Sequence, residues 1–390
     1  MNNHSVFGCA AFASLVFIST PVLADVGNSS NNAVPDTPYV FSPYVKDVWD
    51  SNLQRAESAQ SDQIKSVGVT AGYANKFSQQ NLSVQGSAER QFYTHRDDLN
   101  HTDLHSNANW NGIYGDGKIY TQLSGHYDHT LIDQSTLPQK NFLTAYGGKA
   151  AAGYLIDKNY SFELAAGVDS QRNSMESQKL LDYDDDNLTA SFKYQTARNS
   201  SVRLYFIDGR RDYLRDDSLS LASRLGYDYQ TLGGDITWQI TEKSAVSLGM
   251  DHTKRRGAVS QVSGEDINAG FSWQPTSKLS FIGSFWISHP GVFNDDRNPN
   301  YERGIRLQSN WLMTEKITMR LSGQHTARTY DNFSNSTRYD TLNEFSAGWL
   351  YAFTNKLSMD TSVSRQNRKS NLDGFAFVDR MLSLQLQYKY

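Results

Sequence analysis

Apolar and polar residues alternate with a period of two along most of the chain between Tyr39 and Tyr390. In residues 266–273 (DINAGFSW), one face carries Ile, Ala, Phe and Trp, and the other carries Asp, Asn, Gly and Ser. Residues 160–168 and 317–322 repeat this pattern. Such alternation is typical of strands with one apolar face and one polar face, and a helical period does not fit it. We therefore expect an all-β fold.

Two kinds of connection alternate between these segments. Short turns occur at 78–81, 115–118, 157–159, 198–200, 242–244, 275–278, 315–316 and 354–356. The other connections are mostly longer and charged, for example those at 131–141, 173–186, 290–300 and 330–340. The pattern predicts about 18 antiparallel strands, with both chain ends on the side of the short turns. Moving one hairpin would reduce the number to about 16.

Several of the short turns are copies of one motif. The copies are residues 238–244 (WQITEKS), 273–279 (WQPTSKL), 311–317 (WLMTEKI) and, more loosely, 349–357 (WLYAFTNKL). The repeat spans about one hairpin pair, and a repeat of similar length is also found in β-propellers. A propeller blade, however, needs four short strands and apolar residues on both faces of its sheet. Here one face is polar throughout, which argues against a propeller.

Strands of this length with one apolar and one polar face match those of outer-membrane barrels, whose apolar side chains face lipid. A closed barrel also pairs every backbone N–H and C=O group, as lipid requires. We therefore expect a transmembrane antiparallel β-barrel, with a soluble β-sandwich as the alternative. The aromatic residues beside the short turns would form its inner girdle; they are Tyr154, Tyr160, Trp238, Trp273, Trp311 and Trp349.

The first residues have the features of a targeting segment. Residues 6–18 form an apolar run of the length found in secretory signals, and residues 20–24 (TPVLA) resemble a cleavage region. A buried helix is the alternative. We expect residues 1–24 to be a cleaved signal peptide, 25–38 a short polar periplasmic segment and 39–390 the barrel. The chain would then lie in the outer membrane of a Gram-negative bacterium, in contact with outer-membrane lipids.

The last strand carries a further targeting feature. Leu382, Leu384, Leu386, Tyr388 and Tyr390 share one face and end the chain on an aromatic residue. This resembles the terminal strand that the bacterial barrel-assembly machinery reads, although that strand usually ends in Phe. The barrel-assembly machinery is therefore an expected partner.

Composition and charge narrow the function classes. Only 38 % of the 390 residues are hydrophobic but 12 % are aromatic, which suggests a thin apolar surface around a wet interior. The net charge of −4 gives no reason to expect nucleic-acid binding. The single cysteine, Cys9, lies in the predicted signal peptide. The mature chain would therefore have no disulfide, thiolate metal site or cysteine nucleophile.

With these turns in view, the chain resembles the EpsL-type family of outer-membrane barrels found in exopolysaccharide export operons. The resemblance rests on residues 42–53 (SPYVKDVWDSNL), 61–64 (SDQI), 227–239 (YDYQTLGGDITWQ) and 270–280 (GFSWQPTSKLS). It implies a conduit that passes a secreted polysaccharide from the periplasm to the cell surface, together with a periplasmic polysaccharide-export machinery as partner. The resemblance implies no catalytic residues.

Candidate catalytic and metal-binding motifs are incomplete. Residues 112–118 (GIYGDGK) nearly match a P-loop, but Ile119 stands where Ser or Thr would bind Mg²⁺, and a hairpin turn explains them better. Residues 182–187 (DYDDDN) begin like a calcium loop, yet Asn187 replaces its glycine and Lys193 its final Glu. We read that segment as a solvated outer loop, with a weak divalent site as the alternative. We therefore expect that the protein binds no cofactor and is not an enzyme.

Histidines and acids on two neighbouring strands are the one grouping that a hydrolase could use. His101, His105, His126 and His129 lie there, and His126 should share a face with Asp128. A hydrolase would also need a nucleophile motif, and none occurs. Polar lumen residues of an ordinary barrel explain the grouping better.

The alternation also predicts which charged residues face the lumen. An acidic arc would come from the first half of the barrel, alongside Lys149: Glu89, Asp128, Glu163 and Asp169. A basic arc would come from the second half: Arg203, Arg211, Arg255, Arg306, Arg320, Arg328 and Arg368. Asp235, Asp251, Glu344 and Asp360 dilute the basic arc. The two arcs could set up a field across the channel, although an ordinary mixed-charge lumen is the alternative.

The basic arc could guide an acidic or hydroxyl-rich polymer, because guanidinium groups bind carboxylates in bidentate fashion. The predicted lumen aromatics could stack on sugar rings or simply fill space; they are Tyr93, Tyr120, Tyr205 and Trp286. The expected function is therefore export of an exopolysaccharide through the outer membrane. The alternative is a general or sugar-selective porin for small solutes, and an outer-membrane enzyme or adhesin is a more distant one. A porin usually folds a long loop inward, and the sequence offers no clear candidate.

Overall fold

A computed structural model describes residues 38–132, 140–214, 226–257, 261–289, 301–333 and 336–390. The predicted signal peptide and nearly all of the predicted polar segment lie outside these residues. So do the predicted connection at 290–300 and most of the one at 131–141.

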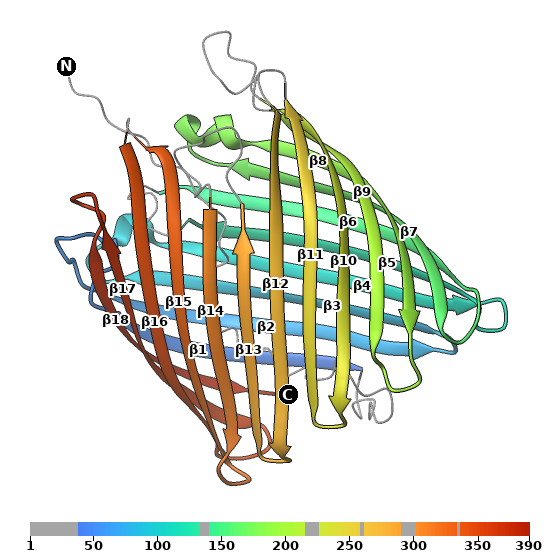
Figure 1. Cartoon of the computed structure of the whole chain (residues 1–390). Helices are drawn as coiled ribbons and strands as arrows, with labels where there is room; N and C mark the ends of the chain where they lie inside the picture. Colours follow the sequence, from blue (N-terminus) through green and yellow to red (C-terminus); the bar gives the residue numbers. More distant parts are fainter. Residues whose placement is uncertain (1–37, 133–139, 215–225, 258–260, 290–300, 334–335) are drawn as a thin grey trace.

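The described residues form one closed, antiparallel barrel of 18 strands, in which β1 pairs with both β2 and β18 (Figure 1). The first half contains β1 (Tyr39–Asp50), β2 (Asp62–Phe77), β3 (Gln80–Tyr93), β4 (His101–Tyr114), β5 (Ile119–Leu131), β6 (Phe142–Leu155), β7 (Tyr160–Asn173), β8 (Tyr183–Gln195) and β9 (Ser201–Tyr213). The second half contains β10 (Tyr227–Thr241), β11 (Ser244–Gly257), β12 (Gln261–Thr276), β13 (Leu279–Ser288), β14 (Tyr301–Leu312), β15 (Ile317–Phe333), β16 (Ser336–Ala352), β17 (Leu357–Ser370) and β18 (Phe377–Tyr388). The predicted fold class is confirmed.

Both ends of the described chain lie at the short turns, as predicted. Tyr39 at the start of β1 pairs with Tyr73 near the first short turn, and the Tyr390 N–H donates to the Phe41 carbonyl over 2.9 Å. Two 3-10 helices, η1 (Asp97–Leu99) and η2 (Glu176–Leu181), lie in connections at the opposite end. Outer-membrane barrels have short turns in the periplasm and longer loops outside, so the helices mark the outer end of the barrel.

Two of the predicted long connections are shorter than expected. β15 and β16 run through most of 330–340, and β8 begins at Tyr183 inside the connection predicted at 173–186. Asp185 and Asp340 in these strand ends face the barrel interior, where they bind Arg211 and Arg338. Charged strand ends of this kind have the composition of a loop, which explains the error.

A shared hydrogen bond explains the repeated turn motif. In each copy, the backbone N–H of the Lys donates to the hydroxyl of the Thr two residues earlier, over 3.1–3.3 Å. The pairs are Thr241–Lys243, Thr276–Lys278, Thr314–Lys316 and Thr354–Lys356. A side chain that bonds the backbone locally in this way favours a tight turn.

The outer face carries the apolar side chains. Trp238, Trp273, Trp311, Trp349, Tyr154 and Tyr160 are all exposed beside the short turns, as the predicted girdle requires. Leu382, Leu384, Leu386 and Tyr388 form an exposed apolar row on the last strand. The part of the chain that the structure describes contains no helix long and apolar enough to cross a membrane.

Candidate functional site

The candidate site is the inner wall of the barrel, where both predicted charge arcs lie. Cross-strand pairing places arc residues beside one another on the same face, as with Arg203 opposite Asp235. Two parts of this wall differ in how their charges are held. The open wall comprises β3–β7 and the paired wall comprises β14–β18.

The open wall carries the predicted acidic arc. Glu89 accepts a hydrogen bond from the Tyr44 hydroxyl over 2.7 Å and lies 3.6 Å from the Lys46 ammonium. Asp128 lies 2.7 Å from the His105 ring. The other two predicted members, Glu163 and Asp169, lie on β7 opposite two glycines of β6.

The predicted basic arc does not form a free positive surface. Four of its arginines contact carboxylates: Arg203–Asp235 at 2.7 Å, Arg211–Asp185 at 2.9 Å, Arg320–Asp360 at 2.5 Å and Arg328–Glu302 at 2.6 Å. Arg255, Arg306 and Arg368 donate to neutral oxygens of His289, Gln324 and Phe375. Ion pairs therefore neutralise much of the arc.

Carboxylates and cations balance over most of the described inner face. On β8–β12, Asp185, Asp235, Asp251 and Asp266 match Lys193, Arg203, Arg211 and Arg255. On the paired wall, Glu302, Asp340, Glu344, Asp360 and Asp379 match Arg306, Arg320, Arg328, Arg338 and Arg368. Among the described strands, the open wall has the clear excess: its inner face carries Lys149 against Glu89, Asp103, Asp128, Glu163 and Asp169, and Lys46 of β1 offsets Glu89 from outside this wall. The field across the lumen therefore arises mainly from this acidic excess.

Five aromatic side chains lie over glycines of the neighbouring strand on the inner face. A Cβ added to the glycine would come within 2.0–2.4 Å of the ring in every case. The pairs are Tyr44–Gly68, Tyr120–Gly153, Tyr205–Gly233, Tyr229–Gly209 and Trp286–Gly304. Three of these aromatics were predicted from the sequence. Tyr44 and Tyr229 were missed, because only the strand register reveals which tyrosine lies opposite a glycine.

Three of these aromatic side chains reach across the strand that carries the glycine and bind a carboxylate on the next strand. Tyr44 donates to Glu89, Tyr229 donates to Asp185 over 2.9 Å, and Tyr205 donates to Asp251 over 3.3 Å. Trp286 donates to Glu302 on the glycine's own strand over 2.8 Å. The rings are therefore fixed against the wall, with the face away from the glycine directed to the lumen.

The fourth predicted aromatic, Tyr93, lies at the outer mouth and is only 9 % exposed. It packs with Leu53 and Leu99 from two loops, and Ile64 and Leu131 extend this small core. The ring is thus covered by the loops, which leaves it little surface to offer a sugar. On the exposed side of the same loop, the Arg96 guanidinium donates to Asp98 over 2.8 Å and lowers the pKa of that carboxyl group.

The open wall also holds a polar cavity of about 360 Å³, called the lumen pocket below. Its side chains are polar or charged, and glycines widen it. Its lining residues are Asn107, Asn109, Ser124, Gly125, His126, Gly148, Lys149, Gly167, Asp169 and Asn187. Amides, a hydroxyl, an ammonium and a carboxylate in one place can donate and accept hydrogen bonds with a hydroxyl-rich solute.

The segments that resemble a P-loop and a calcium loop are parts of the barrel wall and its turns. Gly115, Asp116 and Gly117 all have positive φ and form the β4–β5 hairpin turn, so the P-loop alternative is excluded. The segment 182–187 was predicted to be an outer loop, but most of it lies in β8, where Asp184 binds Arg172 over 2.6 Å. Among the described residues, no group of three His, Cys, Asp or Glu side chains could hold a metal ion.

The four histidines on β4 and β5 do not converge on one point. His101 lies 3.2 Å from Asp103, His105 pairs with Asp128, and the His126 ring is 3.5 Å from Asp169. His129 contacts the Thr144 hydroxyl. His126 and Asp128 do share the inner face, as predicted, but they bind different partners.

Comparison with known proteins identifies the fold. No family model and no curated protein matches the chain. Among solved structures, OccK2 (OpdF) of Pseudomonas aeruginosa has a TM-score of 0.52 at 9 % identity, over 91 % of this chain and 97 % of that one. OpdK of Pseudomonas aeruginosa with vanillate has a TM-score of 0.51 at 9 % identity, over 90 % and 99 %. At this identity the likeness shows the fold alone, which is that of an outer-membrane β-barrel such as the outer membrane protein OpdK.

Proposed function

We propose that the chain forms a porin-type channel through which small hydrophilic solutes diffuse across the outer membrane. The observation that carries this proposal is the closed 18-strand barrel with an apolar outer face and a polar inner face. Barrels of about 16–18 strands leave an aqueous channel. The likeness to the Occ and Opd porins favours this function over polysaccharide export.

The inner wall also suggests a class of solute. The lumen pocket offers amides and a hydroxyl group, and the arginines of β8–β18 are balanced by carboxylates. A neutral, hydroxyl-rich solute can hydrogen-bond to such a surface without a net charge to match. We therefore infer that neutral sugars and polyols pass more readily than anions of the same size.

Swelling of proteoliposomes measures this directly. Liposomes containing the purified barrel are placed in isotonic solutions of monosaccharides, disaccharides and vanillate. The proposal predicts that the liposomes swell faster in monosaccharides than in disaccharides. It also predicts that they swell more slowly in vanillate than in monosaccharides. Failure of a folded barrel to admit monosaccharides would refute it.

A matched pair of variants links the transport to the lumen pocket. Asn107→Trp fills the pocket from β4, whereas Leu123→Trp adds the same side chain to the exposed outer face of the adjacent β5. Asn107→Trp should slow disaccharide entry, and Leu123→Trp should leave it unchanged. Equal rates in the two variants would remove the pocket from the solute path.

Exopolysaccharide export is the second candidate, and one observation favours it. Tyr120, Tyr205 and Trp286 lie over glycines with a ring face directed to the lumen, a geometry that suits stacking on sugar rings. A clean deletion with complementation tests this function by measuring polysaccharide outside the cell and retained within it. Loss of the outside fraction, restored by the intact gene, would support export and a periplasmic export partner. Unchanged secretion would leave the porin as the function.

A further inference from the structure

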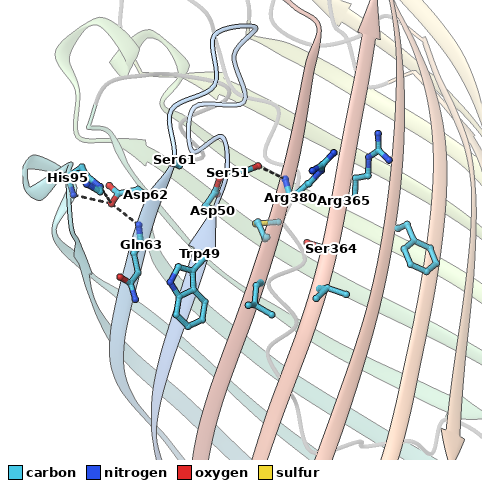
Figure 2. Close-up of a pocket in the computed structure, with 14 residues that line it drawn as sticks. Trp49, Asp50, Ser51, Ser61, Asp62, Gln63, His95, Ser364, Arg365 and Arg380 are labelled. Carbon is cyan, nitrogen blue, oxygen red and sulfur yellow. Dashed lines mark hydrogen bonds and ion pairs between the residues drawn. The ribbon is translucent and has the colours of Figure 1, made fainter.

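A groove of about 710 Å³ lies on the outer face of the barrel, near the loop end of β16–β18, β1 and β2 (Figure 2). Its apolar lining comes mainly from Trp49, Phe345, Val363 and Leu382, which are all exposed. Since these side chains belong to the lipid-facing row of their strands, the groove opens to the membrane and not to the lumen.

Two arginines lie at the end of this groove nearest the loops. Arg365 of β17 and Arg380 of β18 are directly opposite each other in the strand register. Figure 2 shows both guanidinium groups above the apolar side chains, on the side of the loops. Like charges directly opposite on one face of a sheet destabilise it. This pair therefore needs another source of compensation.

No carboxylate of the described residues compensates the pair. Neither guanidinium takes part in an ion pair or a side-chain hydrogen bond there, and only the backbone of Arg380 binds, to Ser51. The acids near the groove have other partners. Asp50, which lines it, accepts a hydrogen bond from the Asn52 N–H over 2.7 Å. Asp62 accepts hydrogen bonds from the backbone of the 94–96 segment, and Asp47 accepts both of its bonds from Gln63. The lumen arginines, by contrast, mostly contact carboxylates.

We propose that this groove binds a phosphorylated lipid of the outer leaflet. Its acyl chains would lie against Trp49, Phe345, Val363 and Leu382, and its phosphate would bind Arg365 and Arg380. A guanidinium group presents a planar pair of donors that matches phosphate in bidentate fashion, and two of them suit one phosphate. The proposal holds whichever solute the lumen carries.

A second copy of the chain is a poorer occupant. In a two-fold symmetric contact each copy would present the same surface to the other. Arg365 and Arg380 of one copy would then approach the same arginines of its partner, which adds repulsion where an anion is needed. A lipid phosphate provides both the missing charge and, through its acyl chains, the apolar contact.

The test uses the full-length folded barrel in detergent, with diphosphorylated lipid A and its dephosphorylated form as probes. Native mass spectrometry counts bound lipid during a titration. We expect the diphosphorylated form to bind at this site and Arg365→Gln/Arg380→Gln to weaken that binding by about tenfold, since hydrogen bonds to charged groups are the strong ones. Arg90→Gln is the matched control, because Arg90 is an outward arginine of β3 that donates to Thr102.

A second variant tests the apolar part of the groove. Phe345→Ala removes an exposed ring from the lining and should weaken binding of both lipid forms while leaving the preference for phosphate. Heat-dependent mobility on a denaturing gel confirms that each variant is folded. Equal binding of the two lipid forms, or unchanged binding by the double arginine variant, would overturn the proposal. A dimer abolished by the arginine changes would overturn it in favour of an interface between copies.

Discussion

The open wall (β3–β7) and the paired wall (β14–β18) use the same kinds of residue for different purposes. On the paired wall, Glu302 is 1 % exposed and holds both Arg328 and Trp286. On the open wall, the side chains of His126 and Asp169 are 41 % and 49 % exposed and lie 3.5 Å apart. Charges of the paired wall therefore stabilise the barrel, whereas Asp128 and Asp169 of the open wall remain available to water and solute. Counting charged residues by sign does not distinguish the two.

The largest expected effect comes from removing one carboxylate of the paired wall. Glu302→Ala takes away the group that holds Arg328 and Trp286, and breaking a buried ion pair costs about 3–5 kcal/mol. Asp169→Asn on the open wall should change the free energy of unfolding by less than about 0.5 kcal/mol, as is usual for exposed positions. Urea titration of the refolded barrel in lipid vesicles measures both. Equal losses would abolish the distinction between the walls.

Two glycine substitutions should destabilise the two walls by different, intermediate amounts. Gly304→Ala places a methyl group 2.2 Å from Trp286, which Glu302 holds in place, and should destabilise the barrel by about 1–3 kcal/mol. Gly153→Ala places one 2.0 Å from Tyr120, whose flexible end can move into the lumen, so the loss should be smaller. The same unfolding titration compares them, and a greater loss for Gly153→Ala would contradict this account.

The smallest expected effect concerns ion selectivity. Removing two acids of the open wall, Asp128→Asn/Asp169→Asn, should raise the anion-to-cation permeability ratio about two- to fivefold, because a unit charge near a passing ion is worth about 1 kcal/mol in water. Arg320→Gln/Asp360→Asn removes one neutral pair and should leave the ratio unchanged. The reversal potential in a salt gradient gives the ratio for each variant.

The guiding role of the basic arc can be judged by the same measurement. Arg320→Glu/Arg328→Glu reverses two positions of the paired wall, and a channel that uses these arginines to attract anions must lose anion permeability. Because the Arg320 and Arg328 side chains are only 23 % and 17 % exposed, against 42 % and 49 % for Asp128 and Asp169, we expect the effect per charge to be smaller than at these acids. An effect as large as that of the acids would restore the guiding role.

The sequence predicts the barrel well because its fold depends on local patterns. Alternation specifies the strands, and the Thr and Lys of the repeated turn specify hairpins through one local hydrogen bond. The face of each arc residue also follows from alternation. Both arcs could therefore be placed on the inner wall without a structure.

What the sequence does not reveal depends on register and on the loops. The contact of Arg328 with Glu302 and the position of Tyr120 over Gly153 join neighbouring strands, and parity does not say which residues are opposite. The cover over Tyr93 comes from Leu53 and Leu99 in two loops. Arg365 and Arg380, on the outer face, become a pair only when β17 and β18 are aligned.

We propose that the barrel encloses an aqueous channel whose field comes from the acidic excess of the open wall. Recording from the purified protein in a planar bilayer under a potassium chloride gradient tests this most directly. We predict discrete conductance steps and a reversal potential with the sign of a mild cation preference. A folded barrel that inserts without conducting, or one that prefers chloride, would contradict the account.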